Sequence, residues 1–578
     1  MDLVKRANQL LAAKKFGELD LVIDKLRAKE PQIAHELCLQ KWANLGDTKE
    51  LEKCFDEYFD RFDNVPNSNR LTAASLKHDL EKYDEALVVA ERVFETEPSN
   101  FSAAEIIFSC AVNLQQSKLA LRVASTMVDE AERLNEPETV VLDYKIKQLM
   151  GTALVGLYPE TLGIWDELLP QFEKYPARLD ASVFACVLRS LDGVGNIDEA
   201  LRLIDEYGLE ADEYPSTSEL EMVLPQIYVS AGQDDKALNS YRRVAEKYQD
   251  RAEPRWNYSL GLLATGRLRE GFEQFEIRWQ WRDFPSKKRL FSSPRWEGES
   301  LEGKSILVWG EQGVGDQLLF LSLLPFVLEK SPADLTIEVS YKLIKLVKEW
   351  YPEATVRGDD VVDTVGQSVY DQLDFQIPSG SLMRLVANSN GSIAVNKRLM
   401  RLKQDAKDVF LPPHLLEKRV IVGLSWRSTL ITETREFNYL SVLAAEEIVT
   451  SLPNDIGFIC LQYAMTDEEK KLMGKYDNVL VPEEDFFDDV YSNAYHTGCC
   501  DVVVTAGTIV VQLAGIFSVP VLTWLPKRDW VLLGQDNYPW FDNILVVRGD
   551  ANWDKESMLA ELLRKLKIML RIKPPALH

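Results

Sequence analysis

The 578-residue sequence lacks several features that would each point to a class of protein. It has no dense run of Lys and Arg, since 66 basic residues stand against 91 acidic ones and the net charge is −25. Nucleic-acid binding needs a basic stripe to meet the phosphates, so we expect no nucleic-acid partner. No stretch approaches the roughly 20 uninterrupted apolar residues that cross a bilayer. We therefore also expect no membrane span.

The sequence also lacks the cysteine and histidine spacings of a metal site. The seven cysteines are odd in number and show no CxxC spacing, and the five histidines form no HExxH motif. Disulfide frameworks and metal sites usually show such spacings. The first twenty residues mix charges into every turn and have no apolar core of a secretory signal. We expect reduced thiols, no bound metal and a cytoplasmic protein.

Residues 1–280 instead show amphipathic helical spacing with an internal repeat. Segments such as EKYDEALVVAERVFETEPSN and GQDDKALNSYRRVAEKY align on one small or apolar position. The aligned positions are Leu19, Leu51, Ala86, Ala120, Leu162, Ala200, Ala237 and Gly271. Their intervals of 32 to 42 residues lie near the period of about 34 of tetratricopeptide helix pairs. We expect an all-α solenoid that binds a protein, with an irregular solenoid of another type as the alternative.

The composition changes after this array. Residues 281–302 are rich in aromatic and basic side chains, and we interpret them as a connector that straps the array to a second, different domain. From there, short apolar runs such as ILVWG, LTIEVS, VIVGLSW and DVVVTA alternate with helical stretches. This alternation predicts two doubly wound α/β domains with parallel sheets, over 303–415 and 416–578. Ligands bind such sheets at the carboxyl ends of the strands, so we expect a cleft there.

A glycine-rich segment, WGEQGVGDQLLF, follows the first of these strands and precedes a helix. Its loop residues are Gly310, Gln312, Gly313 and Gly315. Glycines permit tight turns, and a helix N-terminus offers free N–H groups to an anion or to sugar hydroxyls. Asp316 opens the helix; it is either a cap or a general base at the cleft.

Two further segments combine a strand end with anion-binding groups. The first, VGLSWRSTLITETREFNY, supplies Ser425, Arg427, Ser428 and Arg435. Hydroxyls and guanidiniums beside a strand end suit a diphosphate, although salt bridging at the surface is the alternative. The second, TAGTIVVQLAG, places Ala506, Gly507 and Thr508 at a helix N-terminus. Their backbone N–H groups are suited to the same phosphates.

The second half resembles bacterial tetratricopeptide proteins whose C-terminal region is similar to GT-B glycosyltransferases, including heptosyltransferase-like enzymes and flagellin O-glycosyltransferases. The resemblance rests on PRWEGESLEGKSILVWGEQGVGDQLLF, VGLSWRS, FICLQY, DVVVTAGTIVVQLAG and DWVLLGQDNYPWFDNILVVR, which sample most of residues 290–550. It implies a GT-B pair in which 303–415 faces the acceptor and 416–578 holds a nucleotide-sugar.

The resemblance also implies roles for single residues. Asp316 matches the proposed catalytic base, and Ser425, Arg427 and Ser428 match residues near the donor phosphates. Thr508 and Gln512 match the donor-side helix. The family pattern often has an aspartate where this sequence has Gly507 and a histidine where it has Gln512, and both departures remove groups that contact a donor.

The expected function is therefore a metal-independent transferase that moves a sugar from a nucleotide-sugar to a Ser or Thr hydroxyl of a protein held by the solenoid. The resemblance favours a flagellin as the acceptor and a nonulosonic acid carried on CMP as the donor, with no other cofactor. Inversion and retention both stay open. The alternative is a non-catalytic scaffold whose GT-B-like half has lost its activity.

Overall fold

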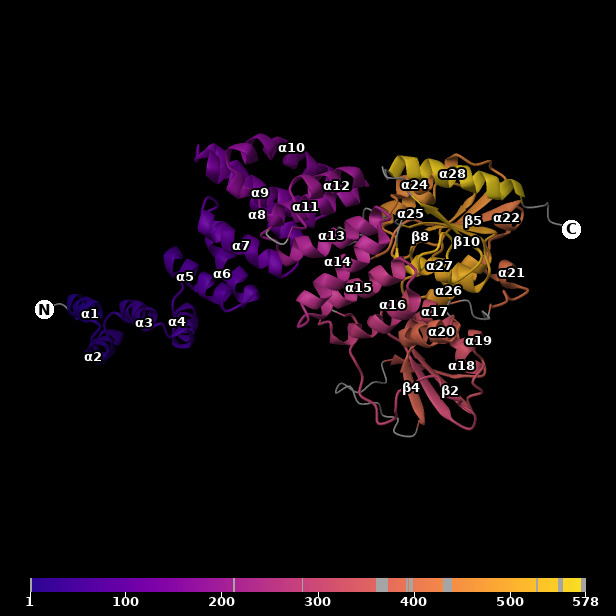
Figure 1. Ribbon diagram of the computed structural model, residues 1–578, viewed down its shortest axis with the longest axis horizontal. Coiled ribbons are helices and arrows are strands. Elements are labelled where there is room, and N and C mark those ends of the chain that lie inside the picture. The colour runs from indigo at the N-terminus through magenta and orange to yellow at the C-terminus, as the bar shows by residue number, and fades with distance from the viewer. Residues whose placement is uncertain are drawn as a thin grey trace. The chain divides into compact units, whose positions relative to one another are not determined.

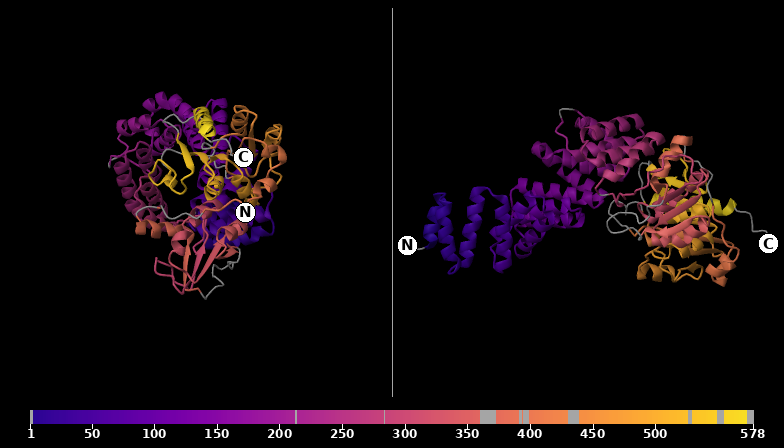
Figure 2. Two further views of the ribbon diagram at one scale, coloured as in Figure 1. Left: turned by 90° about the vertical axis from the view of Figure 1, so that its right-hand side faces the viewer. Right: turned by 90° about the horizontal axis from the view of Figure 1, so that it is seen from below.

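The computed structural model describes residues 3–211, 214–282, 284–359, 373–390, 393, 399–429, 439–525, 529–548 and 555–572. It divides into two compact units, Met1–Cys186 and Val187–His578. The first unit is helical, and its successive helices pack against one another in chain order (Figure 2). These helices are α1 Leu3–Ala12, α2 Phe16–Arg27, α3 Pro31–Leu45, α4 Thr48–Arg61, α5 Asn67–Asp79, α6 Tyr83–Thr96, α7 Phe101–Asn113, α8 Ser117–Arg133, α9 Glu138–Leu154, α10 Tyr158–Lys174, η1 Pro176–Arg178 and the start of α11 Ala181–Gly193.

The second unit begins with the last helices of the array. They are α12 Ile197–Glu206, α13 Ser218–Ser230, α14 Asp234–Lys247, α15 Ala252–Ala264, α16 Leu268–Phe275 and the 3-10 turn η2 Glu276–Gln280. Within this unit α13 packs on α14, α14 on α15 and α15 on α16. The unit boundary therefore falls inside the predicted solenoid, and the last repeats form one compact body with the sheets.

The helix pairing that the repeat predicts is confirmed. All eight aligned positions lie in even-numbered helices, from Leu19 in α2 to Gly271 in α16. Six of them are buried, while the weaker copies Leu51 and Leu162 are half-buried. The reason for a small residue is visible at Gly271, where a Cβ atom would lie 2.6 Å from Cδ2 of Leu263 in the preceding helix. The pattern thus marks the close approach of paired helices.

The first sheet has four parallel strands in the order β3-β2-β1-β4. Its strands β2 and β4 are labelled in Figure 1. The strands are β1 Ser305–Trp309, β2 Asp334–Val339, β3 Thr355–Gly358 and β4 Phe375–Pro378. The helices of this region are α17 Val314–Leu321, α18 Leu324–Leu328, η3 Tyr341–Leu343, α19 Ile344–Trp350, η5 Ser379–Ser381, α20 Leu382–Asn390, α21 Ala406–Phe410 and α22 Pro413–Leu416.

The second sheet has six parallel strands in the order β10-β9-β8-β5-β6-β7. The strands are β5 Val420–Ser425, β6 Ile456–Cys460, β7 Val479–Leu480, β8 Val502–Ala506, β9 Val521–Leu525 and β10 Ile544–Arg548. The remaining helices are α24 Val442–Thr450, α25 Asp467–Met473, α26 Val490–Gly498, α27 Ile509–Ile516, η6 Trp530–Leu532 and α28 Lys555–Ile572.

Helices cover both faces of the second sheet. On one face, Val504 packs in a core with Ile448 of α24 and Leu562 of α28. On the other face, Val503 packs in a core with Leu513 of α27. Neighbouring strand residues thus point into opposite cores, as expected of a parallel sheet buried on both sides. The predicted fold class, an all-α repeat array followed by a pair of doubly wound α/β sheets, is confirmed.

The connector places aromatic rings against the first sheet's surroundings. Phe291 and Trp309 have ring centroids 5.6 Å apart, and the ring of Trp296, which is fully buried, lies 5.9 Å from that of Phe326. Arg295 forms a parallel bridge with Gln376, next to β4. In the described part of the chain, no helix is both long and apolar enough to cross a membrane.

Candidate functional site

The glycine-rich loop joins β1 to α17 at the carboxyl edge of the first sheet. Gln312 takes a φ of +62°, a left-handed conformation that few side chains adopt, and Gly313 precedes the first turn of α17. The Gly313 N–H donates to Oδ2 of Asp316 at 3.1 Å. Asp316 is therefore a cap of α17, as one of its two predicted interpretations requires. Its role as a general base stays a prediction.

Two side chains from outside the first sheet hold this loop. The fully buried guanidinium of Arg278 donates through Nε and Nη2 to Glu311 at 3.0 and 2.9 Å. Ser286 Oγ accepts the Gln312 N–H at 2.6 Å. Burial raises the pKa of Glu311, and the Arg278 charge opposes that rise. The loop conformation thus depends on η2 and on the connector.

The first loop of the second sheet is held from within that sheet. Gln462, which follows β6, accepts the N–H groups of Trp426 and Arg427 at 2.9 and 3.0 Å. Its amide nitrogen donates to the carbonyls of Arg427 and Tyr463, both at 2.9 Å. Ser425, buried at the end of β5, has its Oγ 3.4 Å from the same amide oxygen. One side chain therefore fixes the path of the predicted donor loop.

Arg427 already has a carboxylate partner. Its Nε donates to Oε1 of Glu469 at 3.0 Å, and Nη2 bonds Oε2 of Glu469 and the Ala464 carbonyl. Although burial opposes ionisation, hydrogen bonds from Arg427, Thr466 and Trp426 hold the pKa of Glu469 below its usual value. The contact of Arg427 with a diphosphate stays a prediction, and it would require the guanidinium to be shared between Glu469 and the phosphate. Arg435 lies outside the described residues.

Tyr463 connects the two predicted donor segments. Its hydroxyl hydrogen-bonds with the side chains of Ser428 and Thr508, and burial raises its pKa against these bonds. Thr508 is the N-cap of α27, and its Oγ1 accepts the Val510 N–H at 3.4 Å. The ends of β5 and β8 are adjacent in the sheet, so the structure brings the two sequence segments together.

The turn before α27 is tight. Thr508 N–H donates to the Ala506 carbonyl at 2.6 Å, and Ala506 is fully buried. A Cβ atom on Gly507 would lie 2.7 Å from Cδ2 of Leu525 on β9. A larger residue at this position would therefore require the Leu525 side chain to move.

The two sheets meet at the N-termini of α17 and α27. A Cβ atom on Gly315 would lie 3.6 Å from Cα of Ile509 and 3.8 Å from Oε1 of Gln512. Gln512 also lies 3.3 Å from the hydroxyl of Tyr538. Burial raises the pKa of Tyr538, and the negative charges of Asp529 and Asp316 add to the rise. Gly315 of the glycine-rich loop segment and Gln512 of the donor-side helix, both predicted site residues, therefore lie side by side.

Some residues of this site are absent from the sequence-based set. Arg278 and Glu311 were missed because the pair joins residues 33 positions apart across the end of the repeat array. A signal exists, since an acidic residue inside a glycine-rich loop needs a cation when the loop is buried. Gln462, Tyr463 and Tyr538 lie in segments that carry the family resemblance, but no local motif singles them out.

The described residues contain no group of three or more His, Cys, Asp or Glu side chains able to hold a metal. The groups that do converge are two helix N-termini, hydroxyls and the Asp316 carboxylate. Helix N-termini stabilise phosphate charge, and a carboxylate can accept a proton from an attacking hydroxyl. The arrangement suits group transfer from a phosphorylated donor.

No family model matches the chain. It is 24% identical over 408 residues to Protein FlbA of Caulobacter vibrioides, and the match covers 68% of this chain but only 65% of that protein. Similar solved structures include a glycosyl transferase family 9 protein of Veillonella parvula (10% identity, 47% of this chain, 99% of that chain, TM-score 0.35). They also include ADP-heptose lps heptosyltransferase II of E. coli (12%, 46%, 98%, 0.34) and a tetratricopeptide repeat protein of Parabacteroides merdae (13%, 45%, 97%, 0.31).

Proposed function

We propose that the protein is a glycosyltransferase that moves a sugar from a nucleotide-sugar to a hydroxyl of a protein acceptor. The observation that carries the proposal is the meeting of the α17 and α27 N-termini beside Asp316. One sheet supplies a carboxylate, and the other supplies a helix N-terminus capped by Thr508. These are the two kinds of group that sugar transfer from a phosphorylated donor needs.

The donor phosphates would lie against the turn at Gly507 and Thr508, with Ser428 alongside. The positive end of α27 would stabilise the negative charge that develops on the leaving nucleotide, without a metal ion. Asp316 would accept the proton of the attacking hydroxyl as the new glycosidic bond forms. A nucleotide-sugar donor fits a cytoplasmic location, and the helical array would recruit the acceptor protein. A flagellin acceptor and a CMP-nonulosonic acid donor are the first pair to test.

The test is a transfer assay with the purified full chain, a panel of UDP-, GDP-, ADP- and CMP-sugars, and intact-mass measurement of the acceptor. We expect that donors of one nucleotide class increase the mass of the acceptor by the mass of the transferred sugar. Asp316→Asn should lower the rate by about 10²- to 10⁴-fold, because it keeps the shape but removes the base.

Asp374→Asn is the matched control. Asp374 accepts the Ser305 N–H at 2.9 Å where β1 begins, at the opposite edge of the same sheet, so its loss should leave the transfer rate unchanged. Full transfer by the Asp316 variant would refute the role of that carboxylate.

A non-catalytic scaffold is the second candidate, and one observation favours it. The α17 and α27 N-termini are in near contact at Gly315 and Ile509, so a diphosphate cannot lie directly between them without the helices separating. Thermal denaturation with the same nucleotide-sugars separates the candidates. Stabilisation by one nucleotide class supports the transferase. No shift of the unfolding temperature with any nucleotide-sugar, together with tight binding of a protein, supports the scaffold.

A further inference from the structure

The last helical hairpin, formed by α15, α16 and η2 (residues 252–280) and called here the bracket hairpin, contacts both sides of the proposed cleft. On the first side, η2 reaches the glycine-rich loop through the Arg278 pair with Glu311, in which both side chains are fully buried. Arg278 also donates to Ser381 Oγ at 2.9 Å, in the turn after β4. The guanidinium therefore joins the carboxyl ends of β1 and β4.

The space around this pair is fully used. A Cβ atom on Gly380 would lie 1.8 Å from Oε1 of Glu311, so any other residue there would expel the carboxylate. Glu276 Oε1 accepts from Ser381 Oγ at 2.8 Å and from Arg278 at 3.1 Å. A buried network with its members paired in this way holds one arrangement of the loop and resists gradual displacement.

On the second side, the turn between α15 and α16 touches the loop that follows β9. A Cβ atom on Gly534 would lie 2.5 Å from the backbone nitrogen of Gly266. Both glycines have a positive φ, +73° and +81°. The rings of Phe275 and Trp530 lie 6.1 Å apart. The same loop carries Tyr538, which lies against Gln512 of α27.

The bracket hairpin is itself tightly packed. Leu263 of α15 occupies the space above Gly271 of α16, and Trp256 and Phe275 have ring centroids 4.8 Å apart. Close-packed interiors transmit a displacement because they have no free volume to absorb it. The hairpin also continues the repeat array, because α15 packs on α13 and α14.

We infer that the bracket hairpin sets the spacing of the two cleft sides, with Arg278 and Gly534 as positioning residues. The assignment of these two loops to a cleft rests on the proposed function. The mechanical coupling is independent of it, because the coupling concerns two loops in the free protein.

Hydrogen exchange of the full chain tests the coupling. Gly534→Ala introduces a Cβ atom that must push the bracket hairpin from the second side. We expect about ten-fold faster exchange in residues 529–541 and also in residues 310–317, on the other side of the cleft. Glu311→Gln keeps the shape of the side chain but weakens its bond to Arg278 on the first side. We expect it to speed exchange in residues 310–317 and also in residues 529–541. This variant tests the coupling even if Gly534→Ala does not fold.

Gly208→Ala is the matched control. Gly208 has a φ of +61°, and a Cβ atom there would have no neighbour within 4 Å, so the substitution adds the same backbone strain without a collision. Its exchange in both loops should match that of the unaltered protein. The coupling is refuted if each variant changes only its own loop or neither loop. A failure to bind any nucleotide-sugar would refute the proposed function and leave this result standing.

Discussion

The two sides of the cleft are held in different ways. The loop after β1 depends on Arg278 and Ser286, which come from the repeat array and the connector. The loop after β5 is held by Gln462 and Glu469, which follow the neighbouring strand β6. The loop after β5 is therefore held from within its own sheet, whereas the loop after β1 depends on the helices and the connector. The Arg278 contacts join the last repeats to the first sheet within one compact unit.

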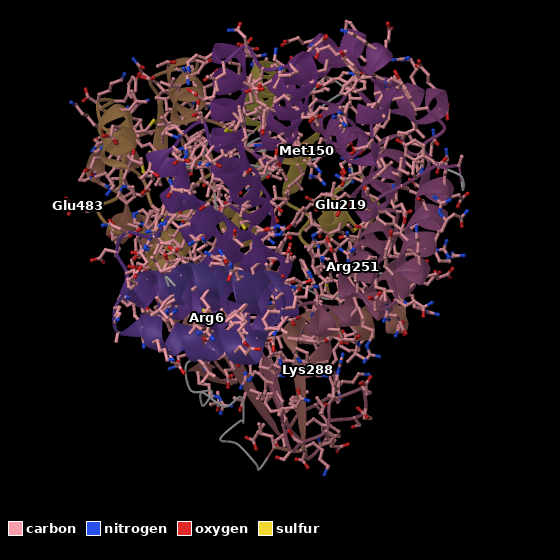
Figure 3. The ribbon with its side chains drawn as sticks, turned by 90° about the vertical axis from the view of Figure 1, so that its left-hand side faces the viewer. Arg6, Met150, Glu219, Arg251, Lys288 and Glu483 are labelled. Carbon is pink, nitrogen blue, oxygen red and sulfur yellow. The ribbon has the colours of Figure 1, made fainter. Side chains whose placement is uncertain are left out.

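The connector has an exposed face and a face that contacts the glycine-rich loop. Lys288 is exposed on this segment and is labelled above the strands of the first sheet in Figure 3. Ser286, two residues earlier, is half-buried and bonded to the glycine-rich loop. The connector thus combines a solvated face with a face that supports the site.

The largest effect should follow from breaking the buried pair on the first side. Arg278→Met leaves the Glu311 carboxylate buried without its main partner, which we expect to cost about 3–5 kcal/mol. Native-state hydrogen exchange of the β1 amides measures the loss. The double variant Arg278→Met with Glu311→Met should recover much of it, and a double variant as unstable as the single one would contradict this origin.

Acid should weaken the first side of the cleft through the carboxyl group of Glu276. Burial works to raise the pKa of Glu276, but Arg278 and Arg295 hold that pKa at about 2. Because this folded value is below the unfolded value, the stabilisation is present above about pH 4.5 and is lost as the pH falls toward 2. It amounts to roughly 3 kcal/mol. Glu276→Gln should make the free energy of unfolding of the unit less dependent on pH between pH 4.5 and 2. An unchanged pH dependence would exclude Glu276 as the source of this stabilisation.

A smaller effect should follow from the matching change on the second side. Arg427 and Glu469 are 14% and 10% exposed, so water can partly replace a lost partner. We expect Arg427→Met to cost about 2 kcal/mol, measured from the exchange of the β5 amides. A loss of stability as large as that caused by Arg278→Met would contradict the proposed difference between the two sides.

The smallest effect should come from Ser286→Ala. It removes the acceptor of the Gln312 N–H and should cost about 1 kcal/mol. The expected result is faster exchange of that one amide with no change in the global unfolding temperature. Global destabilisation would show that the connector does more than support this loop.

Much of the fold was predictable because local patterns carry it. The small residues at Ala86, Ala120 and Ala237 mark paired helices, and apolar runs such as VVVTA mark buried strands. The strands β3, β4 and β7 do not stand out in the sequence because they are short, and TVRG of β3 and FQIP of β4 also contain polar residues or a proline. The site was predictable only where a strand end carries a motif. Pairings between distant segments, such as Arg278 with Glu311, leave no periodic trace.

The most direct test of a cleft shared by the two sheets is hydrogen exchange of the full chain with each nucleotide-sugar of the panel. We predict that one nucleotide class protects residues 310–317 on the first sheet and residues 506–512 on the second sheet together. Protection of neither segment by any nucleotide-sugar, or protection confined to other parts of the chain, would contradict a shared cleft.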